Sequence, residues 1–255
     1  MKKIVLFFSL FLTINASAQT IINAEKLGSP KDSLLLAVEV SYSGTRGNAV
    51  TDQIDFAPSF LLIGKKNDFK LFAGYSVLSA DEESLLNSGF IHFRHNYKIF
   101  KRLKTFGFYQ IQFNEVLLLK KREAYGAGLR YSLINKDSLS FDMGIGIMQE
   151  NEFLDKTSLL ANETVNTYFI RGAIVSSFEW VINESVKINN VLYFQPNISS
   201  FKDYRVLNDF SLIAKLSDEI YFTTSLTLRC DSRPPSSLKA FDSVLDVGIG
   251  YAFSK

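Results

Sequence analysis

The sequence has little cysteine, histidine, tryptophan or proline. Its 255 residues include one cysteine, one tryptophan, two histidines and five prolines. A single cysteine cannot form an internal disulfide, so the folded chain must rely on its hydrogen bonds and packing. The histidines, His92 and His95, are three residues apart on one predicted strand and point to opposite faces, so they cannot bind one metal ion together. We therefore expect no metal site and no cofactor.

An excess of charge of one sign is also missing. The chain has 28 basic and 26 acidic residues, a net charge of +2, which gives no overall field for attracting nucleic acid. Although 47% of the residues are hydrophobic, no apolar run reaches the roughly twenty residues of a membrane-spanning helix. The apolar residues must therefore either fill a soluble core or alternate onto a wall that faces lipid.

The N-terminus has the three parts of a secretory signal. Lys2 and Lys3 precede an apolar run from residue 4 to residue 14, and small residues at 16–18 precede Gln19. A lipoprotein would have cysteine where Gln19 stands. We expect residues 1–18 to be a cleavable signal peptide, residues 19–32 a short periplasmic lead, and residues 33–255 a single outer-membrane domain.

The C-terminal segment shows strict two-residue alternation. A strand sends successive side chains to opposite faces, and a barrel in lipid needs apolar residues outside with polar or small residues inside. The same pattern recurs in segments 121–134, 138–152 and 219–231. In the last strand one face has Leu245, Val247, Ile249, Tyr251 and Phe253, and the other has Asp246, Gly248, Gly250 and Ala252. This pattern predicts an all-β fold, an antiparallel transmembrane β-barrel.

Turn signals divide the chain into about twelve strands, an even number, as expected for a bacterial barrel. Tight polar turns, expected on the periplasmic side, alternate with generally longer links such as 152–163, 197–203 and 231–240. The predicted strands are 33–45, 49–63, 68–80, 86–100, 104–118, 121–134, 138–152, 164–181, 185–196, 204–216, 219–231 and 241–253.

Several short motifs resemble one known family. Residues 41–48 (SYSGTRGN), 122–131 (REAYGAGLRY) and 143–146 (MGIG) are similar to strand-and-loop patterns of the DUF481 family of YdiY-like, salt-induced outer-membrane proteins. The resemblance extends over about residues 33–253. It implies an outer-membrane barrel, and it provides no catalytic residues to carry over.

Polar and charged residues of both signs fall on the face predicted to point inward. They either pair across the lumen and close it, or line a narrow path for a small solute. The candidate lumen-lining residues are Glu39, Asp55, Lys70, His92, Arg94, Gln110, Gln112, Asn114, Arg130, Asp142, Glu150, Arg171, Glu179, Lys187, Asp209, Arg229 and Asp246.

The favoured hypothesis is an integral outer-membrane barrel without enzymatic activity: a narrow channel, a small-solute binder or an envelope-stress component. Its partners would be outer-membrane lipids and a small solute, not nucleic acid; its oligomeric state is not indicated. Two alternatives stay open. A lipid-modifying barrel enzyme would use the outward-facing His95 with a serine on a neighbouring strand. A soluble periplasmic barrel would instead turn the apolar face inward around a lipophilic ligand.

Overall fold

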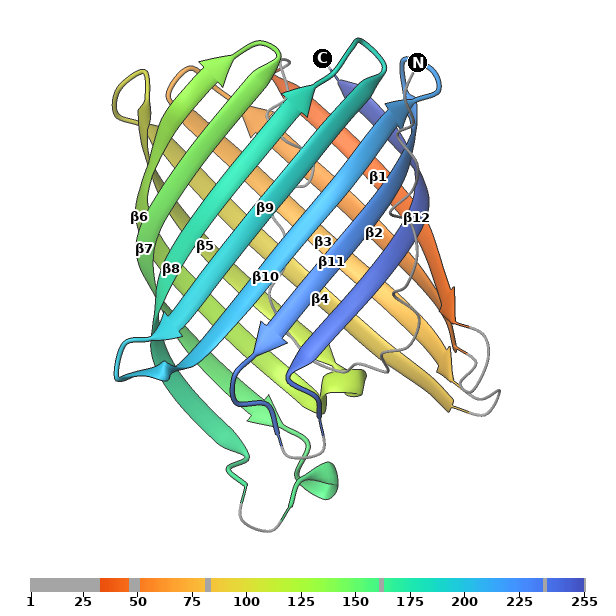
Figure 1. Ribbon diagram of the computed structural model, residues 1–255, viewed down its shortest axis with the longest axis vertical. Helices are drawn as coiled ribbons and strands as arrows, with labels where there is room; N and C mark the ends of the chain where they lie inside the picture. Colours follow the sequence, from red (N-terminus) through yellow and green to blue (C-terminus); the bar gives the residue numbers. More distant parts are fainter. Residues whose placement is uncertain (1–32, 46–50, 81–83, 161–162, 236–237, 255) are drawn as a thin grey trace, which may run out of the picture.

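Twelve antiparallel strands form a closed barrel (Figure 1). Each strand pairs with its neighbours in sequence, and β1 pairs with β12 to close the sheet. The computed structural model describes residues 33–45, 51–80, 84–160, 163–235 and 238–254. The predicted fold class and strand number are confirmed, whereas the predicted signal peptide and periplasmic lead lie outside the described residues.

The strands are β1 (Leu34–Thr45), β2 (Thr51–Ile63), β3 (Asn67–Ala80), β4 (Ser84–Lys98), β5 (Leu103–Asn114), β6 (Leu119–Lys136), β7 (Leu139–Leu154), β8 (Asn166–Val181), β9 (Val186–Asn197), β10 (Ser200–Lys215), β11 (Ile220–Asp231) and β12 (Phe241–Ser254). Two 3₁₀ turns, η1 (Glu115–Leu117) and η2 (Lys156–Ser158), follow β5 and β7.

Apolar side chains cover the outside of the barrel. In β12, Val247, Ile249 and Tyr251 are exposed, Ile249 by 58%, while Gly248 and Gly250 between them are buried. An outer wall this apolar suits contact with lipid. Within the hydrocarbon of a bilayer, only helices and closed β-barrels satisfy every backbone hydrogen bond. Among the described residues, no helix is long and apolar enough to cross a membrane.

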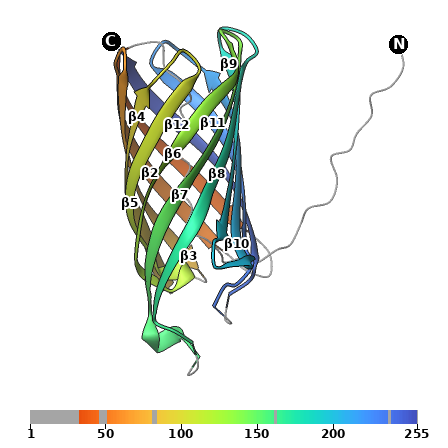
Figure 2. The ribbon, with the colours of Figure 1, turned by 90° about the vertical axis from the view of Figure 1, so that its left-hand side faces the viewer.

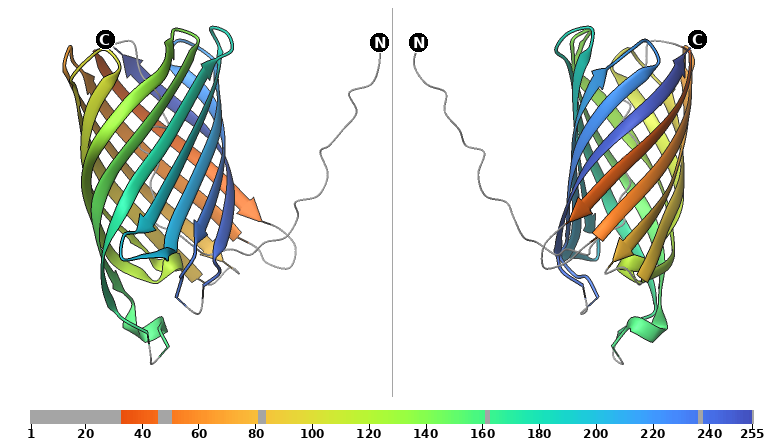
Figure 3. Two further views of the ribbon diagram at one scale, coloured as in Figure 1. Left: turned by 60° about the vertical axis from the view of Figure 1, so that its left-hand side comes forward. Right: turned by 90° about the vertical axis from the view of Figure 1, so that its right-hand side faces the viewer.

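The two ends of the barrel differ. Tight turns join β2 to β3, β4 to β5, β6 to β7, β8 to β9 and β10 to β11, and β12 ends beside them (Figure 1); we call this the tight-turn end. The opposite end, the loop end, includes both 3₁₀ turns and the hairpin of β7 and β8, which projects beyond the other loops (Figures 2 and 3).

Two predicted boundaries at the loop end are wrong. The link predicted at 197–203 is only residues 198–199, because β10 begins at Ser200 and continues through a register shift before Tyr204. The strand predicted to run to residue 118 ends at Asn114, whose side-chain oxygen accepts a hydrogen bond from the Leu117 amide and caps η1. Leu118 then adopts a left-handed conformation, with φ of 55°, which turns the chain into β6.

Glycines on the inner face make room for larger side chains of neighbouring strands. A Cβ atom on Gly128 would lie 2.6 Å from the ring of Phe106, and a Cβ atom on Gly144 would lie 2.7 Å from Val175. Side chains at these positions would displace the ring or the neighbouring strand. The β6–β7 wall is therefore thin, and the interior beside it is filled from β5 and β8.

A row of outward-facing tyrosines lies near the loop end. On β3, Tyr75 donates a hydrogen bond of 2.8 Å to Asn87 of β4, and on β5, Tyr109 donates one of 3.1 Å to Glu123 of β6. On β1, Tyr42 makes the same kind of bond to Asp52 of β2. Amphipathic tyrosines with a satisfied hydroxyl suit the boundary between lipid and water.

Candidate functional site

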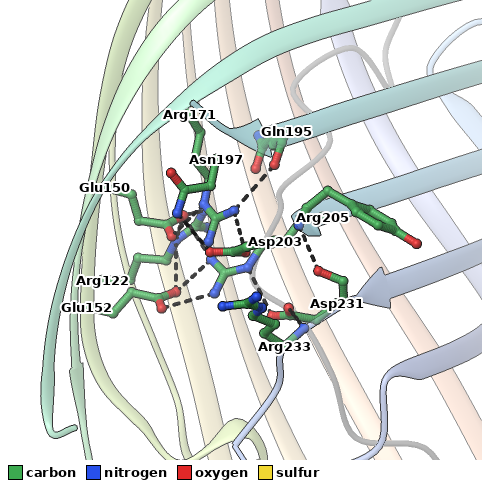
Figure 4. Close-up of polar contacts among 12 residues, drawn as sticks. Arg122, Glu150, Glu152, Arg171, Gln195, Asn197, Asp203, Arg205, Asp231 and Arg233 are labelled. Atoms are coloured by element: carbon green, nitrogen blue, oxygen red, sulfur yellow. Dashed lines mark hydrogen bonds and ion pairs between the residues drawn. The ribbon is translucent and has the colours of Figure 1, made fainter. Parts of the chain in front are cut away.

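Seven charged residues meet inside the barrel toward the loop end (Figure 4). We call them the charged belt: Arg122 of β6, Glu150 and Glu152 of β7, Arg171 of β8, Asp203 and Arg205 of β10, and Asp231 of β11. Each belongs to the inward-facing set of its strand and is almost fully buried.

Glu150 is the centre of the belt. Its carboxylate accepts hydrogen bonds from Arg122 Nε at 2.9 Å and from Arg171 Nε at 3.0 Å, and Arg205 Nη1 lies 2.8 Å away. The side chain is 0% exposed. A buried carboxylate is tolerated only when cations and hydrogen bonds replace its water shell, and three guanidinium groups do so here.

Arg205 joins strands that are not neighbours. Its guanidinium makes two bonds to the Glu152 carboxylate, of 2.8 and 3.0 Å, and its Nε donates to Asp231 at 3.0 Å. Strands β8 and β9 separate β10 from β7, a path of about 14 Å along the wall at about 4.8 Å per strand. The Arg205 side chain therefore cuts across the lumen and does not follow its wall.

Arg171 makes a second crossing. Its Nη1 donates to Asp203 Oδ1 at 2.9 Å and approaches the backbone oxygen of Gln195 at 3.4 Å. Asn197 supports the same carboxylate, because its side-chain amide donates to Asp203 Oδ2 at 2.9 Å. Arg122 and Arg171 are each 1% exposed, so water hardly reaches these two side chains as they are arranged.

A cavity lies directly beside the belt, on its tight-turn side. Met148 lines it and precedes Glu150 on β7, while Tyr193 lines it and precedes Gln195 on β9. Both strands run from the tight-turn end to the loop end, which places the cavity on the tight-turn side of the belt. Its volume is about 30 Å³, room for one or two water molecules.

The cavity has cationic and aromatic walls. The Arg94 guanidinium lies 5.7 Å from the centre of the Phe106 ring and 6.0 Å from that of Phe108. The His92 ring stacks on Phe108 at 5.6 Å, and its Nδ1 is hydrogen-bonded to Gln110 at 2.9 Å. None of the described residues that line the cavity has a carboxylate.

The structure places the seventeen candidate lumen residues in two groups. The buried ones are Glu39, Lys70, His92, Arg94, Gln110, Gln112, Arg130, Glu150, Arg171 and Asp209. The half-buried ones are Asp55, Asn114, Asp142, Glu179, Lys187, Arg229 and Asp246. Only Glu150 and Arg171 belong to the belt, and only His92, Arg94 and Gln110 line the cavity.

Several other candidates make local contacts. Asp55 accepts hydrogen bonds from Gln53 at 2.7 Å and from Ser76. Lys187 and Glu179 form an ion pair of 3.5 Å between the adjacent strands β8 and β9. These contacts follow the wall and leave the lumen uncrossed.

Sequence reasoning missed five belt residues: Arg122, Glu152, Asp203, Arg205 and Asp231. Asp203, Glu152 and Asp231 fell in or at the edge of predicted links, and Arg122 lies at the start of its predicted strand. The signal was present, because Arg205 and Asp203 keep the two-residue phase of Asp209 and Glu152 keeps that of Glu150. Following the inward phase to the ends of the predicted strands would have included four of them, and extending the strand 204–216 by one residue would have included Asp203.

His95, the residue on which the enzyme alternative depends, points outward near the tight-turn end. Its Nε2 is hydrogen-bonded to Asn67 at 2.9 Å, and its ring stacks on Phe69 at 4.7 Å. The hydrogen-bond partner of this nitrogen is thus an amide and not a serine. Among the described residues, no group of three or more His, Cys, Asp or Glu side chains is arranged to hold a metal ion.

The model of the family described as "Protein of unknown function, DUF481" matches residues 38–253. The chain belongs to the DUF481 family. This match covers nearly all of the barrel and confirms the family predicted from the sequence. No curated protein matches this DUF481 chain significantly.

Solved structures with the same architecture are outer-membrane barrels. The COG4313 outer membrane channel from Pseudomonas putida F1 has a TM-score of 0.56 at 8% identity, covering 92% of this chain and 100% of its own. The NanC porin has a TM-score of 0.53 at 11% identity, covering 86% and 99%. The translocator domain of the autotransporter NalP from Neisseria meningitidis has 0.53 at 9% identity, covering 90% and 91%. At these identities the likeness establishes the fold alone.

Proposed function

We propose that this DUF481 protein is a narrow outer-membrane channel that its charged belt holds closed. In this proposal residues 1–18 are removed on export, and the tight turns face the periplasm. Small solutes pass only when the ion pairs of the belt rearrange. The crossing of the lumen by Arg205, from β10 to Glu152 of β7, is the observation on which the proposal rests.

The size of the barrel makes such a crossing necessary for closure. Side chains of ordinary length fill an eight-stranded barrel, whereas barrels of sixteen to eighteen strands leave an aqueous channel. With twelve strands, long side chains must reach inward, and Arg122, Arg171 and Arg205 are the long side chains of the belt. The fold likeness to the COG4313 channel and the NanC porin supports a role in solute passage.

Single-channel recording in planar lipid bilayers tests the proposal. We expect the unaltered protein to conduct rarely and weakly, and Arg205→Ala to raise the conductance or the open fraction several-fold. Lys187→Ala is the matched control, because its ion pair with Glu179 joins adjacent strands and does not cross the lumen. Arg205→Met is the second variant, since it removes the ion pairs but keeps most of the side-chain volume.

The folding of each variant is checked by comparing boiled and unboiled samples on a gel. If folded Arg205→Ala and Arg205→Met both conduct no more than the unaltered protein, the belt does not close a channel. If Lys187→Ala conducts as much as the Arg205 variants, closure does not depend on the crossing.

A further inference from the structure

We infer that a hollow on the outside of the barrel binds the uncharged sugar headgroup of a membrane glycolipid. The hollow lies over β6, β7 and β8 at the loop end, near the projecting hairpin of β7 and β8 (Figure 2). Six of its eight lining residues belong to the outward-facing sets of these strands, so we call it the outer hollow. The inference goes beyond the proposed channel and does not depend on it.

Aromatic and amide side chains alternate across two strands of the outer hollow. In the register of β7 with β8, Asn151 lies opposite Tyr168 and Phe153 lies opposite Asn166. Phe153 is 43% exposed and Tyr168 is 57% exposed, so both rings are open to a ligand. Directly opposite residues are about 5 Å apart and diagonal ones about 7 Å, so one six-membered sugar ring can touch all four side chains.

The remaining polar groups favour an uncharged ligand with hydroxyl groups. On β6, Lys121 and Glu123 form an ion pair of 3.1 Å, so their charges offset each other and do not select an ion. The Asn151 side-chain oxygen and the Thr167 hydroxyl are buried and have no hydrogen-bond partner among the described residues. Half a turn about the Cβ–Cγ bond exchanges the oxygen and nitrogen of Asn151, so the amide can present either atom. A sugar hydroxyl both donates and accepts, and it can therefore pair with either.

The size of the outer hollow suits one sugar ring. Its volume is about 300 Å³, the lower end of the range for small-molecule sites. Such sites combine aromatic surface with a few polar groups that fix the orientation of the ligand. The C–H face of a pyranose can lie on the ring of Phe153 or Tyr168, while the hydroxyls at its edge reach Asn151 and Asn166.

The position of the outer hollow favours a glycolipid over a free sugar. Glu123, which lines it, accepts the hydrogen bond from Tyr109 in the row of tyrosines near the loop end, where lipid meets water. On the tight-turn side, the next outward residues of β6 and β8 are Tyr125 and Ile170, each 41% exposed on the lipid-facing wall. A headgroup in the hollow can keep its acyl chains against this wall, and the apolar contact adds to the binding of the sugar.

Native mass spectrometry of the purified barrel tests the inference. The detergent is tetraethylene glycol monooctyl ether, which has no sugar that could fill the hollow. Monoglucosyl dioleoylglycerol is compared with dioleoylglycerol, which lacks the sugar, and with dioleoylphosphatidylglycerol, whose headgroup is charged. We expect the glucolipid to bind about tenfold more tightly than either.

Three outcomes would overturn parts of the inference. Equal binding of dioleoylglycerol would overturn the sugar assignment, and equal binding of dioleoylphosphatidylglycerol would overturn the preference for an uncharged headgroup. Methyl β-D-glucoside has the same sugar without acyl chains. If it binds as tightly as the glucolipid, the lipid-facing wall contributes nothing and the ligand is a free sugar.

Two variants locate the site. Tyr168→Leu removes aromatic surface and Asn151→Leu removes an amide, so each should weaken the glucolipid about tenfold and leave the binding of dioleoylglycerol unchanged. Tyr125→Leu is the matched control, because Tyr125 is an exposed outward tyrosine of β6 that does not line the hollow. Comparison of boiled and unboiled samples shows that each variant is folded. Equal effects of Tyr168→Leu and Tyr125→Leu would overturn the location, and tight binding by Asn151→Leu would overturn the hydrogen bonds.

Discussion

Removing Glu150 should destabilise the barrel less than removing Arg205, although Glu150 is the more deeply buried of the two. The belt has three arginines and four carboxylates, so its formal charge is 3 − 4 = −1. Glu150→Ala changes this to 3 − 3 = 0. Each arginine then keeps a carboxylate: Arg122 keeps Glu152 at 3.4 Å, and Arg171 keeps Asp203 at 2.9 Å.

Arg205→Ala has the opposite effect, because it changes the charge of the belt to 2 − 4 = −2. Glu152 and Asp231 lose the bonds of 2.8 and 3.0 Å that Arg205 provides. Breaking one side of a buried ion pair costs about 3–5 kcal/mol, because the partner left behind is an uncompensated charge. We therefore expect about 3 kcal/mol of lost stability for Glu150→Ala and about 5 kcal/mol for Arg205→Ala.

The measurement is equilibrium unfolding in guanidinium chloride, with the barrel in lipid vesicles and the fluorescence of Trp180 as the signal. Trp180 is the chain's single tryptophan and lies on β8 away from the belt, so its own environment is unchanged by either substitution. The free energy of unfolding of Glu150→Gln should lie between those of Glu150→Ala and the unaltered protein, because the glutamine side-chain oxygen still accepts a hydrogen bond from one arginine. If Glu150→Ala loses more stability than Arg205→Ala, the formal charge of the belt does not determine the effect of these substitutions.

Two further predictions concern the outside of the molecule. Trp180 is 45% exposed near the tight-turn end. Phospholipids brominated close to the headgroup should therefore quench its fluorescence more than phospholipids brominated deep in the acyl chain. If water-soluble iodide quenches Trp180 as strongly as the headgroup-brominated lipids do, the side chain lies in water. At the loop end, hydrogen bonds from the Thr157 side chain and amide, then from Lys120, lower the pKa of Asp155 below its usual 3.8. A lowered pKa stabilises the folded turn above the ordinary value, and this stability is lost as pH falls through the folded value. The protection of the Thr157 amide against hydrogen exchange should therefore decrease only below about pH 4. In Thr157→Ala, the pKa of Asp155 measured by NMR titration should rise toward the ordinary value without reaching it, because the backbone amide at 157 and Lys120 remain.

The two-residue alternation was enough to predict the barrel, because the lipid outside imposes it on every strand. Alternation was a weaker guide to where each strand ends, because polar residues there are compatible with either a loop or an inward face. The segment from Asn197 to Asp203 shows the difficulty: serines and asparagine suggested a loop, but the chain continues as strand through a register shift after Ser200. Only pairing with β9 distinguishes the two, and this pairing is not visible in a single sequence.

The belt could not be predicted for a related reason. Arg205 and Glu152 are 53 residues apart, and no local spacing connects them. Alternation indicates that both point inward, but which inward residues meet depends on the stagger of the strands around the barrel. Glu150 and Arg171 were identified as lumen candidates, whereas their shared contact follows from the register of β7 with β8.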